Sequence, residues 1–343
     1  MRHVRNGSRV TAMALTATLA VMVAGCATAS ARAGAASTFP AVFAASFSYT
    51  SPTADHGDLG ERIALLSART GDLLRWLTPR QDGTFDTVLS VRDGWVYFLR
   101  GGANVSIWRV PVAGGRTRLV RPGAAGCALC PDAGYAVSPD GRAVAYVISA
   151  DHGDVLELVA RNLATGQQNT IIMATKPSPG ANNWPPGLSG LSWAPDDVHL
   201  AVQFYPTAAI NSVLVFDAFT ARTLSDGRAA PSSCRVTNKP VCEEFDPAYL
   251  ASGALTYVTQ RISATGTASA SLVKWQSGRL TTLLSFPAAP SAFYDMTPQG
   301  QAIWADAPAN PDKSWTIWRW SGGTPVKITA LPPPCYGLGG IAW

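Results

Sequence analysis

Short stretches in which apolar and polar residues alternate run through most of the chain, separated by turns rich in glycine, proline and aspartate. In residues 135–147, YAVSPDGRAVAYV, two such stretches flank a Pro-Asp-Gly turn. Alternation with a period of two puts every second side chain on one face of a strand, so this segment predicts a β-hairpin. Related hairpins are predicted at 87–99, 191–204, 248–258 and 293–305.

A second kind of unit recurs in phase with these hairpins and consists of a strand, a turn of small residues and another strand. Its copies are residues 63–77, 106–120, 156–172, 212–226, 271–284 and 316–329. Their turns lie 44 to 57 residues apart, a period typical of repeat architectures. Together the two units supply four strands per repeat, here called strands a to d, and this predicts the blades of a β-propeller.

The two ends of the chain are predicted to meet in one blade. Residues 41–47, AVFAASF, supply strand b of blade one, but no strand a precedes them. The final residues 337–343, GLGGIAW, resemble 187–193, GLSGLSW, which form the predicted strand a of blade four. We therefore expect an all-β, six-bladed propeller over residues 39–343, closed by a C-terminal strand that completes blade one.

The hairpin SPDGRAVAYV at 138–147, together with its relatives, resembles the repeat of TolB-type, WD40-like (PD40) propellers. The resemblance covers nearly all of residues 39–343 and implies the same propeller fold. It implies little about function, because propellers of this kind serve many roles.

Residues 1–26 have the layout of an export signal. Three arginines precede an apolar run at 10–24 that is too short and too rich in alanine for a permanent membrane span. The run ends in VAGC, which resembles the lipobox of bacterial lipoproteins and makes Cys26 the expected site of lipid attachment. The alternative is ordinary secretion, with cleavage after the ATA or ARA that follows. Residues 27–38 are small and polar and are interpreted as a flexible tether.

The charge of the chain changes once this signal is set aside. The whole chain carries 27 lysines and arginines against 22 acidic residues, but without the signal arginines 24 basic side chains are left. So small an excess does not indicate a nucleic-acid partner. We expect a monomeric propeller on the outer face of the cytoplasmic membrane, attached only by its lipid anchor, or a secreted one if the lipobox is not used.

The cysteines of the predicted propeller all fall in loops that connect strand d of one blade to strand a of the next. Export favours disulfides over free thiols. Cys234 and Cys242 would close a loop within one connection and form the preferred pair, and Cys127 and Cys130 are a second, tighter candidate pair. Cys335 is then left over, unless it pairs with Cys127 or Cys130.

In a propeller the a–b and c–d turns emerge on one face, here called the turn face, and the b–c and d–a connections emerge on the other, here called the loop face. Binding sites concentrate on long, variable loops that a rigid scaffold positions. We expect ligand contacts from the segments 176–187 and 226–247, with Asn182, Asn183 and Trp184 as candidates. The alternative for Trp184 is a ring folded over a blade interface.

The pentapeptide ADHGD occurs at 54–58 and again at 150–154, and it contains His56 and His152. Both copies precede the small-residue turn of their repeat by a similar distance, which places them in the b–c loops of blades one and three. Loop tips of non-adjacent blades are expected to be too far apart to share a metal ion. Aspartate followed by glycine favours a turn, and contact with a ligand on the loop face is the alternative.

Motifs for catalysis are sparse. The sequence has no G-x-S-x-G nucleophile elbow, and His199 is expected on the surface at the start of a strand b. The acidic pair at 243–244 is placed in a loop without a partner. Asp86, Asp246 and Asp295 lie near strands a, but their spacing does not define a calcium site, which needs six or more oxygen ligands. Calcium in the channel is therefore an alternative to the main expectation of no cofactor.

The resulting hypothesis is a non-catalytic, exported scaffold that binds an envelope protein, a peptide or a glycan through its loop face. The alternative is a metal-dependent hydrolase or lyase with its site at the mouth of the central channel. Bound metal in the purified protein would favour the second hypothesis.

Overall fold

The structure of the protein is a computed structural model. The chain divides into Met1–Thr38 and Phe39–Trp343, and every described residue belongs to the second unit. The described residues are 41–50, 59–101, 106–121, 135–150, 155–175, 187–207, 210–231, 241–262, 268–286, 293–306, 315–331 and 338–343.

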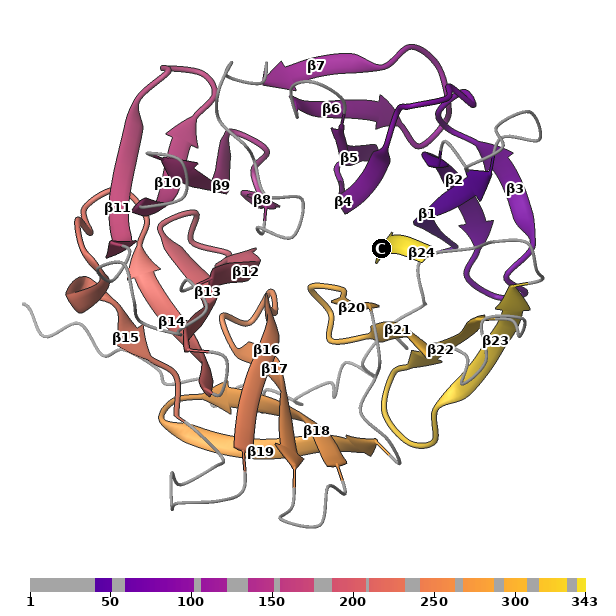
Figure 1. The fold of residues 1–343 in the computed structure, drawn as a ribbon. Coiled ribbons are helices and arrows are strands. Elements are labelled where there is room, and N and C mark those ends of the chain that lie inside the picture. The colour runs from indigo at the N-terminus through magenta and orange to yellow at the C-terminus, as the bar shows by residue number, and fades with distance from the viewer. Residues whose placement is uncertain are drawn as a thin grey trace, which may run out of the picture. The chain divides into compact units, whose positions relative to one another are not determined.

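Six four-stranded antiparallel sheets form the blades of a propeller, with their first strands at the centre of the ring (Figure 1). Blades one and two consist of β24 (Leu338–Ala342), β1 (Val42–Thr50), β2 (Leu59–Ser67) and β3 (Leu73–Trp76), and of β4 (Asp86–Arg92), β5 (Trp95–Arg100), β6 (Ser106–Pro111) and β7 (Arg118–Arg121). Blades three and four consist of β8 (Tyr135–Val137), β9 (Ala143–Ala150), β10 (Val155–Asn162) and β11 (Gln168–Thr175), and of β12 (Gly187–Trp193), β13 (His199–Thr207), β14 (Ile210–Asp217) and β15 (Arg228–Ala229). Blades five and six consist of β16 (Val241–Tyr249), β17 (Leu255–Ile262), β18 (Ala268–Gln276) and β19 (Arg279–Phe286), and of β20 (Phe293–Met296), β21 (Ala302–Asp306), β22 (Trp315–Trp320) and β23 (Val326–Leu331).

The C-terminal strand closes the ring. β24 pairs antiparallel with β1, with Ala342 opposite Ala44 and Ile341 opposite Ala45. The predicted all-β, six-bladed propeller, completed in blade one by its last strand, is therefore confirmed. Pairing with β24 covers the edge that β1 would otherwise expose.

The apolar core lies between the blades, because the two faces of each sheet contact different neighbours. In β5, Val96 and Phe98 pack against blade one, whereas Tyr97 and Leu99 pack against blade three. All four side chains are at most 4% exposed. Burial of a large apolar side chain contributes roughly 1.5–3 kcal/mol. Every blade junction holds a cluster of this kind, so the period-two pattern of the sequence stabilises the ring as well as each sheet.

The boundary between blades four and five differs from the prediction. Residues 222–226, predicted to form strand d, contain the 3₁₀ turn η2 (Leu224–Asp226), and strand d is the short β15 that follows it. The Asp226 carboxylate accepts hydrogen bonds from the backbone N–H groups of Arg222 and Thr223, at 2.8 and 2.9 Å, which favours a turn over an extended strand.

The predicted loop 226–247 is also shorter than expected, because β16 begins at Val241. Val241 lies opposite Ile262 of β17, so pairing with a neighbouring strand determines the conformation of a polar segment with low strand propensity. The prediction of a loop at 243–244 was therefore wrong. Glu244 lies in β16, 2% exposed, and accepts a hydrogen bond from the backbone N–H of Val213 at 3.3 Å.

Candidate functional site

Nearly all of the side chains predicted as site candidates lie outside the described residues. These are Cys26, His56, Cys127, Cys130, His152, Asn182, Asn183, Trp184, Cys234 and Cys335. Their predicted roles and the disulfide pairings stay predictions. The backbone of Cys242 is described, and it belongs to β16 rather than to a d–a loop, which corrects the prediction that all propeller cysteines lie in loops.

A pocket of about 560 Å³ lies between blades four and five and opens at the turn face. Blade four contributes the start of β13, the end of β14 and β15, and blade five contributes the a–b and c–d turns with the strand ends beside them. We call this cavity the inter-blade pocket. The residues that line it include Val215, Leu255, Tyr249, Trp275, His199, Asp217, Asp226, Arg228 and Gln276. Its volume falls within the roughly 300–1,000 Å³ range of small-ligand pockets.

Trp275 forms one wall of the inter-blade pocket. It lies opposite Leu255 and immediately precedes the tight c–d turn, in which Ser277 and Gly278 both have positive φ values, of 51° and 78°. Two successive left-handed residues are the geometry of a two-residue hairpin turn, which fixes the end of the strand. The Arg228 guanidinium lies over the Trp275 ring, 5.1 Å from its centroid. Both side chains line the pocket, and the guanidinium covers this face of the indole.

Gly227 allows the chain to place Arg228 at the pocket. A Cβ atom at this position would lie 2.5 Å from Cζ of Phe216, which is fully buried. Only glycine lets the backbone cross the Phe216 ring this closely before β15 pairs with β14. In β15, Arg228 then lies opposite Val215, another residue of the pocket wall.

His199 and Asp196 form a hydrogen-bonded pair at the rim of the inter-blade pocket. The distance from Nδ1 of His199 to Oδ2 of Asp196 is 2.6 Å, and both side chains are about half exposed. Burial opposes ionisation of Asp196, but hydrogen bonds from the backbone and the side chain of His199 outweigh it and lower the pKa of Asp196. The predicted place of His199, at the start of a strand b and at the surface, is confirmed.

Two further carboxylates of the pocket are held in place by backbone donors. Oδ1 of Asp217 accepts the N–H groups of Phe219 and Thr220, both at 3.1 Å. Oδ2 of Asp226 accepts those of Arg222 and Thr223, and these bonds, with that from Arg222 first, lower the pKa of Asp226. In each carboxylate the turn engages one oxygen through these bonds, and the second oxygen can accept from a ligand.

The central channel holds a second candidate site. A cavity of about 70 Å³ is lined by the ends of strands a, including Ser90 and Arg92 of blade two, Ser192 of blade four and Asp295 of blade six. Oδ2 of Asp295 accepts the backbone N–H of Trp343 at 2.9 Å, and Oδ1 accepts that of Met296 at 2.8 Å. Asp295 therefore connects blade six to the end of the closing strand.

Asp246 and Asp295 interact in the channel. Burial, and then the charge of Asp295, raise the pKa of Asp246 to about 7. Burial also raises the pKa of Asp295, although Arg92 and the backbone N–H groups of Trp343 and Met296 oppose the shift. Two carboxyl groups whose charged forms disfavour each other can share the roles of acid and base.

A β-bulge aims Asp246 into this arrangement. The register between β16 and β17 shifts at this point, and Asp246 has a φ of 52°. Its backbone N–H donates to Oε1 of Gln203 at 3.2 Å. Bulges re-aim side chains and often lie beside functional sites. Sequence spacing alone could not have detected the pair, because the bulge and the burial are tertiary features.

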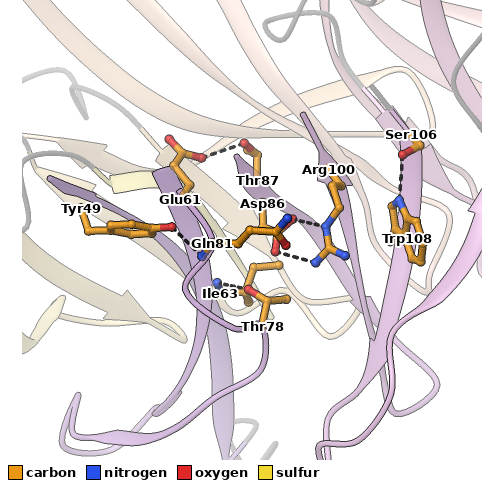
Figure 2. A network of polar contacts seen from close by, with 10 residues as sticks. All are labelled: Tyr49, Glu61, Ile63, Thr78, Gln81, Asp86, Thr87, Arg100, Ser106 and Trp108. Atoms are coloured by element: carbon orange, nitrogen blue, oxygen red, sulfur yellow. Dashed lines mark hydrogen bonds and ion pairs between the residues drawn. The ribbon is translucent and has the colours of Figure 1, made fainter. Parts of the chain in front are cut away.

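Asp86, the third of the carboxylates near strands a, has a structural role. It is 1% exposed and accepts two hydrogen bonds from Arg100, Nε to Oδ1 at 2.7 Å and Nη2 to Oδ2 at 2.8 Å (Figure 2). The two residues are opposite each other in β4 and β5. Nearby, Glu61 of blade one accepts from Oγ1 of Thr87 in blade two at 2.9 Å (Figure 2). The Glu61–Thr87 bond joins blades one and two, and the bonds from Arg100 within blade two leave Asp86 engaged.

Among the described residues, no three His, Cys, Asp or Glu side chains lie close enough together to hold a metal ion. Within the described ranges no helix has the length and apolar character that a membrane span requires. The predicted channel calcium is not tested by these residues and stays an alternative.

No family model matches the chain, and no curated protein matches its sequence. Solved structures do resemble its fold. A TolB-like protein from Agrobacterium tumefaciens has 14% sequence identity and a TM-score of 0.49, over 85% of this chain and 90% of that chain. A puromycin-hydrolyzing peptidase from Mycobacterium tuberculosis also has 14% identity, with a TM-score of 0.48, over 85% of this chain and 46% of that chain.

The β-propeller domain of the Trilobed protease from Pyrococcus furiosus has 11% identity and a TM-score of 0.44, over 73% of this chain and 72% of that domain. The chain therefore spans about half the length of the M. tuberculosis peptidase and most of the length of the other two. Similarity at these identities concerns the fold and carries no information on ligand or reaction.

Proposed function

We propose that this protein is a non-catalytic binding scaffold of the cell envelope, whose partner is an envelope protein, a peptide or a glycan. The inter-blade pocket carries the proposal, although it opens at the turn face and the sequence predicted contacts at the loop face. It combines an apolar wall, formed by Trp275 and Leu255, with the polar side chains of Arg228, His199 and Asp217. A concave, partly apolar site with a few oriented polar groups is typical of ligand recognition.

The expected location supports a role in the envelope. Residues 1–26 have the pattern of an export signal, and the lipobox-like VAGC provides Cys26 for lipid attachment. Cys26→Ser should move the protein from the membrane fraction to the soluble fraction. Mass spectrometry of the mature N-terminus checks the assignment, and an unmodified N-terminus downstream of Cys26 in the wild-type protein contradicts it.

Capture of partners from native envelopes tests the binding function. The immobilised mature protein is compared with Trp275→Ala and with a form shortened within 232–240, which leaves β15 and β16 intact. If the partner contacts the pocket, we expect Trp275→Ala to recover less of it. If the partner contacts the loop face, we expect the shortened form to recover less. Equal recovery by all three proteins contradicts the proposal.

A second candidate function rests on the channel. Asp246 and Asp295, with Arg92 nearby, have the character of an acid–base pair. This supports the alternative of a hydrolase or lyase at the channel mouth, and its predicted dependence on a metal stays a prediction. One equivalent of calcium or zinc in the purified protein, lost in Asp246→Asn, would favour the enzyme. A purified protein that is stable and contains no metal would favour the scaffold.

A further inference from the structure

The inter-blade pocket has a chemistry that narrows the class of its ligand. Its floor is apolar where Leu255, 1% exposed, meets Val215 and the Trp275 ring. Its rim is polar and carries both signs of charge, with Arg228, Asp217 and Asp226 all contributed by blade four. A matching ligand therefore has one apolar face and groups that both donate and accept hydrogen bonds at its edge.

The tryptophan at the equivalent position in blade six is more deeply buried than Trp275. Trp320 lies opposite Ala302 at the start of β21, as Trp275 lies opposite Leu255 at the start of β17. Trp320 is only 8% exposed, and its Nε1 donates to the carbonyl of Gly323 at 3.0 Å. The repeat therefore buries this tryptophan in blade six, whereas in blade five it packs only in part against the core and also lines a cavity.

The acceptors of the pocket are oriented before any ligand arrives. Asp217 and Asp226 are each fixed by two backbone N–H groups of their own turns. Arg228 supplies a planar set of N–H donors beside the indole. The Nδ1 atom of His199 is engaged by Asp196, which directs the ring and leaves Nε2 as its second polar atom. Pre-organisation of the two carboxylates and of the His199 ring reduces the entropy cost of binding.

The balance of charge argues against other ligand classes. An anion that binds Arg228 would also meet the carboxylates of Asp217 and Asp226, and a cation would meet Arg228 itself. A peptide strand bound by its backbone needs a free sheet edge, whereas this pocket is built from turns and strand ends and its strand d has only two residues. A hydroxyl group both donates and accepts, and therefore suits a rim of mixed donors and acceptors.

We propose that the inter-blade pocket binds a neutral saccharide, with a sugar ring stacked on Trp275 and its hydroxyl groups held by Asp217, Asp226 and Arg228. The inference rests on the proposed binding function and specifies its ligand. The C–H face of the sugar stacks on the indole face that the exposed Arg228 covers in the free protein. The guanidinium moves aside and donates to the hydroxyl groups of the sugar.

Titration of the mature protein with neutral oligosaccharides tests this proposal. The probes are maltotriose, cellotriose and diacetylchitobiose, with a set of capped tripeptides in parallel, and binding is measured by saturation-transfer NMR and tryptophan fluorescence. We expect at least one saccharide to bind. Trp275→Ala should weaken it roughly three- to tenfold, the range of aromatic stacking energies. Arg228→Met, at an exposed side chain, should weaken it as well without affecting folding.

Trp95→Ala is the matched control, because Trp95 lies under the guanidinium groups of Arg109 and Arg118, at 4.4 and 5.2 Å, outside the pocket. It should bind the saccharide as the wild type does. The proposal is overturned if none of the three saccharides binds. It is also overturned if Trp275→Ala and Arg228→Met both bind the saccharide as the wild type does. If a tripeptide binds and its binding depends on Trp275, the saccharide proposal is overturned but the scaffold function is not. The scaffold function fails only if the wild type, Trp275→Ala and the form shortened within 232–240 all capture the same amount of envelope partner.

Discussion

At the scale of single residues, burial and the nearest charge decide what each carboxylate near the channel does. Asp86 is almost fully buried, but Arg100 meets both of its oxygens, so the charge is compensated. Asp246 is half-buried beside another carboxylate, and its pKa rises to about 7. The two residues have the same side chain and similar places near strand a, and only their surroundings separate a structural ion pair from a titrating group.

Asp246→Asn tests the raised pKa of Asp246. Below about pH 4 the carboxyl is protonated in both the folded and the unfolded protein. Between about pH 4 and 7 the unfolded chain releases the proton and the folded protein keeps it, so this group lowers the free energy of unfolding as pH rises. The asparagine variant should therefore be more stable than the wild type at pH 8, by roughly 1–3 kcal/mol, and equally stable at pH 3.5.

Urea unfolding at several pH values measures this difference. Asp226→Asn is a control in which stability should change in the opposite direction, because backbone hydrogen bonds lower the pKa of Asp226. Its removal should decrease stability at neutral pH, and the difference should vanish as pH falls to where the carboxyl is protonated in both states. A stability difference for Asp246→Asn that does not change between pH 3.5 and 8 contradicts the assignment.

Asp86→Asn should be strongly destabilising. It removes the charge that compensates Arg100 at a position that is 1% exposed, and breaking a buried pair of this kind costs about 3 kcal/mol or more. Asp82→Asn is the matched control, since the Arg80–Asp82 pair has a separation of 3.8 Å and both side chains are largely exposed. The control should change the unfolding free energy by less than about 1 kcal/mol. Similar losses in both variants contradict the structural role of Asp86.

At the scale of elements, bulges in the inner strands of blades four and five bring side chains together at the channel. β12 shifts register at Gly190 and β16 shifts at Asp246, and both residues have positive φ values, of 50° and 52°. A Cβ atom on Gly190 would lie 2.9 Å from Cδ of Pro247 and 3.0 Å from Oε1 of Gln203. The two bulges therefore fit against each other, and Gln203 receives the N–H of Asp246 in the same contact.

Gly190→Ala should disturb this fit. The left-handed backbone alone costs an alanine about 1 kcal/mol, and the contact with Pro247 adds a packing cost of roughly 1–3 kcal/mol. Gly253→Ala separates the two contributions, because Gly253 has a φ of 77° and nothing lies within 4 Å of its Cβ position. Thermal unfolding should show a clearly larger loss for Gly190→Ala. Equal losses would mean that the two bulges do not contact each other as described.

At the scale of the whole molecule, closure of the ring joins the last strand to two blades. β24 pairs with β1, and Trp343 packs with Phe43 and with Ile303 of blade six. The backbone N–H of Trp343 donates to Asp295, so the channel carboxylate is also a contact of the closing strand. Closure and the channel site are therefore parts of one arrangement.

Trp343→Ala should weaken that closure. The side chain is 4% exposed, and removal of a buried tryptophan costs roughly 3–5 kcal/mol. The backbone bond to Asp295 is kept in the variant, so the loss measures packing. Trp76→Ala, at a ring that is 37% exposed on β3, should lower the melting temperature much less. A Trp343 variant as stable as the Trp76 variant contradicts a stabilising role for the closing strand.

The sequence by itself determined the number of blades, the closure by the last strand and the place of His199, because alternation and turn residues act over a few neighbours and repeat in phase. It missed the start of β16, where pairing with β17 overrides low strand propensity in a polar segment. From the sequence, Asp246 and Asp295 were recognised only as separate carboxylates. Trp275 was not recognised, although it occupies the same position in its repeat as Trp320 does in blade six. Only the tertiary structure decided which of these side chains meet, because bulges, burial and the spacing of adjacent blades bring together residues that are distant in the chain.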